Sequence, residues 1–494
     1  MFYLGIDLGS SSIKIALVEQ HTGKSVGIVK MPQDEMPIYA PQKGWAEQDP
    51  EDWWKHICTG IESIKEQTGI TKEAIIGIGI AYQMHGLVLV DHNGKLLRKA
   101  IIWCDSRAVT IGNNAYTAIG AKKCQSTLLN SPANFTASKL KWVRENEPKV
   151  YAKSYKFMLP GDYIAFRFSG TIKTTVPGLS EGIFWNFKED MLSEEILGYY
   201  GIEKSMVPEV VDTFGQQAVV NQKGAAESGL NEQTPVLYRA GDQPNNALSL
   251  NVFHPGAIAA TAGTSGVMYA ITDTLSAKES TRVNNFAHVN YGKSKPKRIG
   301  KLLCINGTGI QYRWLQQNLG LSDYDTMNQL AQQIPIGADG IVVLPFGNGA
   351  ERMLENKNIG SNILNIDFNR HTKSHIIRAA LEGIAFAFVY GFEILRSDGI
   401  IPQTIRAGND NLFKSTVFSD TITALLQKEI QIFNTTGAIG AARACMLHRG
   451  DYSTFSKVIM DHDHEMTHFP KQNNESYVTA YKNWKKTLEQ LLNH

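Results

Sequence analysis

The sequence lacks an excess of charge of either sign. Its 494 residues include 49 Lys and Arg against 47 Asp and Glu, which leaves a formal net charge of +2. A near balance of this kind provides neither a basic field for nucleic acid nor a polybasic patch for an anionic membrane. The composition therefore favours a small-molecule partner, and we expect neither nucleic acid nor a membrane to be one.

Cysteine is scarce, and its spacing forms no recognisable pattern. No CxxC pair and no zinc-like spacing occurs among Cys58, Cys104, Cys124, Cys304 and Cys445. Reduced thiols in a cytoplasmic protein are the simplest interpretation. The first residues lack a basic segment followed by a long apolar one, so we expect no signal peptide. The apolar stretch LEGIAFAFVYGFEIL carries Glu382 and Glu393, which indicates a buried helix rather than a membrane span.

Two common nucleotide-binding motifs are missing. No GxxxxGK[ST] occurs, and no GxGxxG follows a predicted strand, so a P-loop and a Rossmann site are both unsupported. Two short turns follow apolar strands instead: LGSSS, with Ser10 and Ser11, and AGTSG, with Thr264. Backbone N–H groups and hydroxyls in such turns can hold phosphate oxygens. Either turn alone is equally well an ordinary hairpin, but two facing turns would grip the β- and γ-phosphates of a nucleotide.

The length and a recurring pattern indicate two related domains. A single core stops growing at about 250 to 300 residues, so a chain of this size is expected to form two. The strand–turn–strand pattern of the first 31 residues recurs around the AGTSG turn. We expect an α/β fold with a first domain at 1–245, which includes a more helical insertion at about 110–236, and a second domain at 246–494.

Two carboxylates stand at the ends of apolar segments. Asp7 precedes the first glycine turn, where it could hold Mg²⁺ directly or through water. Asp242, in AGDQPNNA, begins a predicted helix and could accept a hydroxyl proton during phosphoryl transfer. Each has a plain alternative, because Asp7 could cap a hairpin and Asp242 could be the N-cap of the helix.

Further glycine turns lie in the second half of the chain. NGTG, GNGAER and AGNDN include Gly309, Gly408 and Asn411. Each is an ordinary loop when taken singly, but together they are compatible with an adenine or ribose pocket. The cluster DHDHEMTH, residues 461–468, has metal-ligand composition, yet no scaffold is evident that would fix the ligands. We interpret it as a solvated surface loop.

Three residues interrupt a pair of apolar strands in AYQMHGLVLVD. Gln83, Met84 and His85 place polar atoms where a buried strand ends. A His in this setting is usually a satisfied core residue and a Met usually fills space. If the strand end opens into a cleft, however, the imidazole could bond sugar hydroxyls while the thioether packs on the carbon chain.

In their order along nearly the whole chain, these segments resemble the FGGY carbohydrate kinase family. YLGIDLGSSSIK is similar to its first phosphate loop, AIIWCDSRA to its Trp-x-Asp-x-Arg stretch and FTASKLKWVRENEP to a family signature. GTSG, LPFGNGAER, RAALEGIAFA and GAIGAA follow in family order. GWAEQDPEDWW and QMHG resemble the branch of the family that phosphorylates D-xylulose.

The resemblance implies a fold and a reaction. The fold is a pair of actin-like, ribonuclease H-like domains, each a mixed five-stranded sheet flanked by helices, with a cleft between them. Sugar is expected on the first domain and ATP mainly on the second. The reaction is ATP-dependent phosphorylation of the terminal hydroxyl of D-xylulose, with ATP and Mg²⁺ as cofactors. The alternatives are another acceptor, such as ribulose, gluconate or glycerol, or a non-catalytic sugar sensor or assembly protein. A homodimer and a monomer both remain open.

The resemblance also assigns residues by position. Asp242 matches the catalytic base and Asp7 the carboxylate near Mg²⁺. Sugar contacts are expected from Gln83, Met84, His85, Asp242 and Asn245, and ATP contacts from Ser10, Ser11, Thr264, Gly309, Gly408 and Asn411. Asn245 is included because Gln243 and Pro244 follow Asp242 where many members have Asp-Asn. TTVPGLSEGIFWNF departs from the usual Ser-Asp-rich segment, and Ala407 stands in place of a family glycine.

Overall fold

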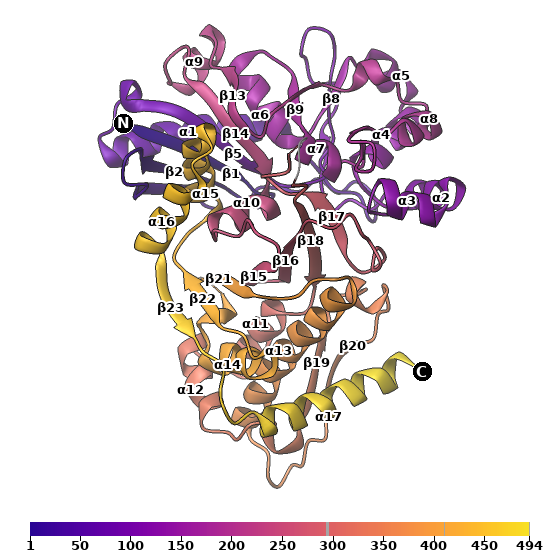
Figure 1. Ribbon diagram of the computed structural model, residues 1–494, viewed down its shortest axis with the longest axis vertical. Coiled ribbons are helices and arrows are strands. Elements are labelled where there is room, and N and C mark those ends of the chain that lie inside the picture. The colour runs from indigo at the N-terminus through magenta and orange to yellow at the C-terminus, as the bar shows by residue number, and fades with distance from the viewer. Residues whose placement is uncertain (293–295, 410, 494) are drawn as a thin grey trace.

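Two mixed β-sheets form the centres of the two lobes that Figure 1 shows in this computed structural model, which describes residues 1–292, 296–409 and 411–493. The first sheet has the order β13 (Phe214–Val219), β14 (Pro235–Gly241), β5 (Ile75–Tyr82), β1 (Phe2–Leu8), β2 (Ile13–Glu19) and β3 (Ser25–Met31). The second has the order β17 (Asn284–Ala287), β18 (Ile299–Ile305), β16 (Gly266–Thr272), β15 (Ala257–Ala262), β21 (Thr404–Gly408), β22 (Ile430–Phe433) and β23 (His464–His468).

The two sheets repeat one topology. In the first, β1, β2 and β3 are antiparallel neighbours, and β5 and then β14 add in parallel on the other side of β1. In the second, β15, β16 and β18 are antiparallel, and β21 and β22 add in parallel. The two turns identified in the sequence, LGSSS and AGTSG, are therefore the equivalent β1–β2 and β15–β16 hairpins.

Each sheet contains the expected five strands and is wider than expected. β13 extends the first sheet to six strands, while β17 and β23 extend the second to seven. These additions pair antiparallel with the outer strands, whose backbone N–H and C=O groups would otherwise be exposed. The prediction that residues 461–468 form a surface loop is therefore wrong for His464–His468, which forms β23. Among the residues that the structure describes, no group of three metal-ligating side chains occurs.

The first lobe carries α1 (Pro50–Thr68), which begins as predicted at Asp49, whose carboxylate accepts a hydrogen bond from the N–H of Glu51 at 3.0 Å. The rest of this lobe, which includes the helical insertion, contains short paired strands and helices: β4 (Glu47–Gln48) with β7 (Ala100–Ile101), β6 (Val88–Val90) with β8 (Lys156–Met158), β9 (Lys173–Thr175) with β12 (Glu209–Val211), β10 (Trp185–Asn186) with β11 (Met191–Leu192), α2 (Val109–Ile119), α3 (Ala121–Thr127), α4 (Thr136–Asn146), α5 (Pro148–Lys153), α6 (Pro160–Ser169), α7 (Val176–Glu181), α8 (Glu194–Tyr200) and α9 (Gln222–Ser228).

The second lobe is centred on α13 (Lys373–Ser397). This helix is long and apolar enough to cross a membrane, but 83% of its most apolar window is buried in the fold, as expected for a core helix. It packs against α11 (Gly309–Asn318), α12 (Tyr324–Gln332), β19 (Val342–Phe346), α14 (Thr416–Leu426) and α17 (Glu475–Leu492). β20 (Gly360–Leu364) pairs with β19, α10 (Asp242–Ser249) and α15 (Gly437–Ala444) pack against each other, and α16 (Tyr452–His462) follows α15 along the chain.

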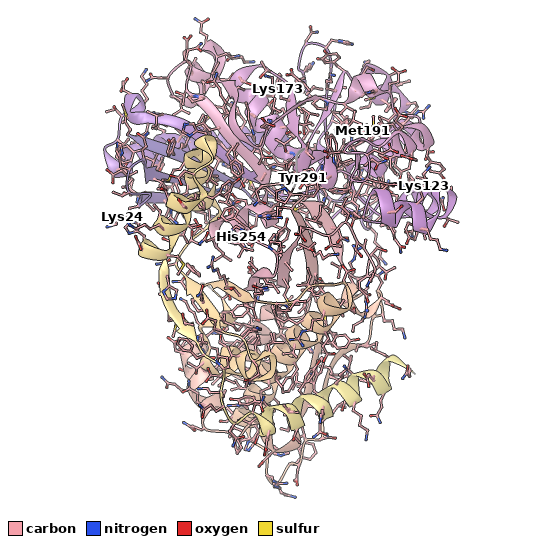
Figure 2. The ribbon with its side chains drawn as sticks, in the orientation of Figure 1. Lys24, Lys123, Lys173, Met191, His254 and Tyr291 are labelled. Carbon is pink, nitrogen blue, oxygen red and sulfur yellow. The ribbon has the colours of Figure 1, made fainter. Side chains whose placement is uncertain are left out.

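The two lobes contact each other along β17, the edge strand of the second sheet. Asn285 donates its backbone N–H to Oδ1 of Asn130 at 2.8 Å, and the Asn130 amide donates to the Asn285 carbonyl. Tyr291, labelled near the middle of Figure 2, donates its hydroxyl to Asp190 at 2.7 Å. The helical insertion is thereby fastened to the second lobe.

Helix α15 returns from the second half of the chain to the first sheet, as Figure 1 shows beside β1 and β2. Two glycines make the close approach possible. A Cβ on Gly5 would overlap the carbonyl oxygen of Ala438, and one on Gly79 would overlap that of Ala441. Since backbone atoms of a helix cannot move aside cheaply, these two strand positions require glycine.

Gly5→Ala is therefore expected to lower the free energy of unfolding by about 1 to 3 kcal/mol, as overpacking does in other cores. The measurement is the apparent melting temperature by calorimetry. Gly198→Ala on α8 is the matched control: no atom lies near the added Cβ, so stability should be unchanged or slightly raised. Equal melting temperatures for Gly5→Ala and the parent would contradict the packing argument.

Candidate active site

The carboxyl ends of the parallel strands bring the predicted residues to one place. β1, β5 and β14 run in parallel. Asp7 near the end of β1, the Gln83–His85 segment after β5 and Asp242 after β14 therefore lie at the same edge of the sheet. A cavity of about 340 Å³ lies there. Its lining includes Asp7, Lys14, Asp242, Gln243, Asn246, Thr264, Gly408, Asn411 and Gly437. Residues from both halves of the chain therefore meet around the two carboxylates.

Burial raises the pKa of both Asp242 and Asp7, and the charge of Asp7 acts on Asp242 as well. Burial, and secondly the negative charge of Asp7, raise the pKa of Asp242 to about 7. Burial also raises the pKa of Asp7, while Lys14, directly opposite Asp7 on β2, acts against this. A carboxylate whose pKa lies near neutrality is well matched to accept a proton from a hydroxyl.

The first glycine turn is held by side chains of neighbouring segments. Gln48 donates its amide to the carbonyl of Ser10 at 2.6 Å, and the indole of Trp103 donates to the Ser10 hydroxyl at 3.2 Å. The carbonyl of Ser11 accepts from the N–H of Met36 at 2.8 Å, and the Ser11 side chain is exposed. Both serines lie on the hairpin beside Asp7, outside the lining of the 340 Å³ cavity.

The second glycine turn joins that cavity to a neighbouring one. The second cavity, of about 500 Å³, shares Gly263, Thr264 and Asn411 with the first and adds Gly309 at the start of α11. The N–H of Gly309 donates to the carbonyl of Gly263 at 2.8 Å, and a Cβ on Gly309 would overlap that oxygen. All four residues predicted for the nucleotide in the second half, Thr264, Gly309, Gly408 and Asn411, thus line one continuous hollow.

His85 has a fixed orientation and tautomer. Its φ of 63° lies in the left-handed region, which is uncommon for a residue other than glycine. Because its partner is a carbonyl oxygen, Nδ1 must be the protonated nitrogen, and it donates to the carbonyl of Glu181 at 3.0 Å. Burial, and secondly Lys139, lower the pKa of His85 to about 3, so the ring is neutral and Nε2 keeps its lone pair.

Lys139 and two aromatic rings complete the surroundings of His85. The Lys139 ammonium donates to the carbonyl of His85 at 2.9 Å. The imidazole packs against the rings of Phe135 and Phe286, with centroids at 4.6 and 5.2 Å. Phe286 belongs to β17, so both lobes contribute to holding the ring. Phe135 and Lys139 belong to the segment FTASKLKWVRENEP, but only the structure shows that they contact His85.

Gln83 and Asn245 turn away from the cavity. The amide of Gln83 donates to Gln48 at 3.1 Å, and Gln48 in turn holds the first turn, so Gln83 positions the loop. Asn245 is buried and donates to the carbonyl of Gly437 at 2.9 Å. On α10 the residues that line the cavity are Asp242, Gln243 and Asn246, the last of which follows the other two by three to four residues, and Asn245 is not among them. A substrate contact of Asn245 stays a prediction.

Lys14 is a functional candidate that the sequence reading missed. It lies opposite Asp7 in the β1–β2 register and lines the 340 Å³ cavity. The sequence does contain a sign of this role, because Lys14 is a charged residue in the otherwise apolar predicted strand IKIALVE.

The carboxylates of Asp7 and Asp242 also fit Mg²⁺. Two carboxylates beside an open cavity leave room for waters and phosphate oxygens, which that ion prefers to retain as ligands.

Comparison with known proteins agrees with this architecture. The model of the N-terminal domain of the FGGY family of carbohydrate kinases matches residues 2–249, and that of the C-terminal domain matches residues 258–448. The chain is 27% identical over 504 residues to the xylulose kinase of Haemophilus influenzae, with 99% of this chain and 100% of that protein covered.

Solved structures share the fold. The xylulose kinase of Rhodospirillum rubrum superposes with a TM-score of 0.87 at 23% identity, covering 100% of both chains. The glycerol kinase of Plasmodium falciparum with ADP gives 0.88 at 19%, covering 99% of this chain and 98% of that one. A gluconate kinase from Lactobacillus acidophilus gives 0.86 at 20%, with 99% and 98% covered. The chain belongs to the FGGY family of carbohydrate kinases and is a sugar kinase.

The electrostatics of Asp242 can be tested without substrate. Its pKa is raised in the folded protein above the unfolded value, so the ionised form destabilises the fold at pH 8. Asp242→Asn should then raise the melting temperature by about 1 to 3 °C at pH 8. The gain should shrink as the pH falls from 7 towards about 4, because the parent protein takes up the proton.

The measurement is calorimetry of both proteins across that pH range. Asp34→Asn serves as the control, since Asp34 is exposed and outside the site. A pH-independent difference, or a loss of stability at pH 8, would show that the Asp242 carboxylate is not destabilised in the fold.

Proposed function

We propose that this protein is an ATP-dependent kinase that phosphorylates the terminal hydroxyl of D-xylulose. The observation that carries the proposal is the position of Asp242. The carboxylate lies at the same sheet edge as Met84 and His85 and lines the cavity that continues into the glycine turns of the second lobe. The similarity to xylulose kinases over almost the full chain supports this acceptor.

In this proposal the first domain, 1–245, binds the sugar and the second, 246–494, binds most of the nucleotide. The 500 Å³ cavity suits the nucleoside, since the stacked rings of Tyr312 and Tyr324 lie beside it, with centroids 5.5 Å apart. The 340 Å³ cavity then receives the phosphates. Thr264 and Asn411 line both cavities and would contact the nucleotide where they join.

The phosphoryl transfer would proceed by positioning and proton acceptance. Asp242 accepts the proton of the terminal hydroxyl as the hydroxyl oxygen attacks the γ-phosphorus in line, and the bond from this phosphorus to the β,γ-bridging oxygen breaks to release ADP. Lys14 and the N–H groups of the two glycine turns balance the charge that develops on the phosphate oxygens. Asp7, through water or directly, would hold Mg²⁺, which supplies further charge neutralisation when bound.

The sugar would be oriented mainly by His85 and Met84. With Nδ1 committed to the Glu181 carbonyl, Nε2 of His85 is an acceptor for a sugar hydroxyl. Met84 is buried and borders Gly241, immediately before the base, where its thioether can pack on the carbon chain. The scattered cysteines and the need for ATP and Mg²⁺ fit action in the cytoplasm.

Asp242→Asn should lower kcat for D-xylulose by about 10²- to 10⁴-fold, the usual contribution of a general base. The assay couples ADP release to a chromogenic reaction, with Asp34→Asn as the active control. The same assay on the parent protein compares D-xylulose with D-ribulose, glycerol and D-gluconate. A higher kcat/KM for one of the other three would transfer the proposal to that acceptor, and full activity of Asp242→Asn would remove Asp242 as the base.

His85→Ala should raise KM for D-xylulose by about tenfold, the effect expected when a hydrogen bond and its packing are lost, while KM for ATP changes less than about twofold. His85→Asn separates an effect on the backbone conformation from the loss of the Nε2 acceptor, because Asn tolerates a positive φ but cannot replace Nε2. We therefore expect it to remain impaired. Equal changes in both KM values would mean that His85 serves only the fold.

A further inference from the structure

Glu181 is a buried carboxyl group for which the proposed mechanism has no use. It ends α7 and is 1% exposed. Its Oε1 is fully buried and meets the distance and angle criteria for a hydrogen bond with none of the residues that the structure describes, and the hydroxyl of Tyr82 is the polar side-chain group next to the carboxyl group. A buried polar atom without a partner costs free energy, and such atoms are uncommon in folded proteins unless a ligand or water completes them.

Glu181 lies near three residues of the proposed sugar site: His85, Met84 and Asp242. Its backbone carbonyl accepts the Nδ1–H of His85 at 3.0 Å. Gly241, the residue before Asp242, leaves an opening that both Glu181 and Met84 border. A Cβ on Gly241 would lie 2.6 Å from Oε2 of Glu181 and 2.5 Å from Cγ of Met84. The carboxyl group of Glu181 therefore lies beside Gly241 and near Met84, while its backbone carbonyl holds the imidazole.

We propose that Glu181 is a specificity-determining residue, whose carboxyl group hydrogen-bonds a hydroxyl of the acceptor sugar other than the one that is phosphorylated. This inference rests on the proposed sugar-kinase function and deepens it. The ligand class is a neutral polyhydroxylated sugar, because such a molecule offers several hydroxyls to a site whose reacting position is fixed by Asp242. Glu181 lies in TTVPGLSEGIFWNF, the segment that departs from the usual family version, so the family resemblance assigns it no role.

The electrostatic surroundings favour this use. Burial, and then the charges of Asp242 and Asp162, raise the pKa of Glu181 well above its usual value. A protonated carboxyl can donate one hydrogen bond and accept another, as a sugar hydroxyl requires. The protonated form also adds no second negative charge beside Asp242. The carboxylate of an aldonate bound near Glu181 and Asp242 would be repelled by the negative charge of Asp242. The arrangement therefore favours a neutral sugar.

The test compares kcat and KM of the parent protein, Glu181→Ala and Glu181→Gln with D-xylulose and with deoxy analogues that each lack one non-reacting hydroxyl. Glu181→Ala should raise KM for D-xylulose about 5- to 50-fold, while KM for ATP stays within about twofold. Glu181→Gln should restore KM to within about threefold of the parent, since the amide also donates and accepts. The matched control is Glu194→Ala, an exposed glutamate on α8.

One deoxy analogue should lose affinity with the parent protein and show no further loss with Glu181→Ala, because the two changes remove the same hydrogen bond. The inference is overturned if Glu181→Ala leaves KM for D-xylulose unchanged. It is also overturned if, for every deoxy analogue, the increase in KM caused by the missing hydroxyl and the increase caused by Glu181→Ala multiply as independent effects do. Parallel changes in melting temperature and in both KM values would assign Glu181 a structural role instead. A parent protein that phosphorylates none of the acceptors would refute the proposed function, and this inference with it.

Discussion

The approach of α15 to the first sheet is the constraint on which the site depends. The helix belongs to the second half of the chain, yet its first turn lies against Asp7, and a Cβ on Gly437 would lie 2.8 Å from Cγ of that residue. Gly5 and Gly79 permit this contact from the strand side. Asn245 strengthens it through its bond to the Gly437 carbonyl. The lobe that supplies most of the 500 Å³ cavity is thereby placed against the lobe that supplies both carboxylates.

Crowding of acidic groups at this junction carries an electrostatic cost that the fold must offset. Asp7, Asp242 and Glu181 all have raised pKa values, and in each case burial is the first cause. A fold selected for stability alone would not place three carboxyl groups together, since each would be more stable in water. Such clustering is typical of functional sites, where a shifted pKa is needed for the chemistry.

Local signals made much of this architecture predictable from the sequence. Asp49 and Pro50 marked the start of α1, and the LGSSS and AGTSG turns marked the hairpins that the duplicated topology makes equivalent. Strand ends placed Asp7, His85 and Asp242 at one edge. The features that the sequence did not predict depend on contacts between distant segments. β23 is an edge strand without alternating apolar residues, and the proposed role of Glu181 follows only from its contacts with His85 and with the space beside Gly241.

The six-residue helix α7 shows how these distant contacts are joined. At its end the Glu181 carbonyl fixes the tautomer of His85, and one residue earlier Ser180 accepts the backbone N–H of Ala287 on β17 at 2.9 Å. β17 also supplies Phe286, which packs on the same imidazole. His85, which we propose to bind the sugar, and the contact between the lobes therefore depend on the same short helix and the same edge strand. Because hydrogen bonds and ring packing are directional, a shift of β17 relative to α7 would change the position of His85 and the contact between the lobes together.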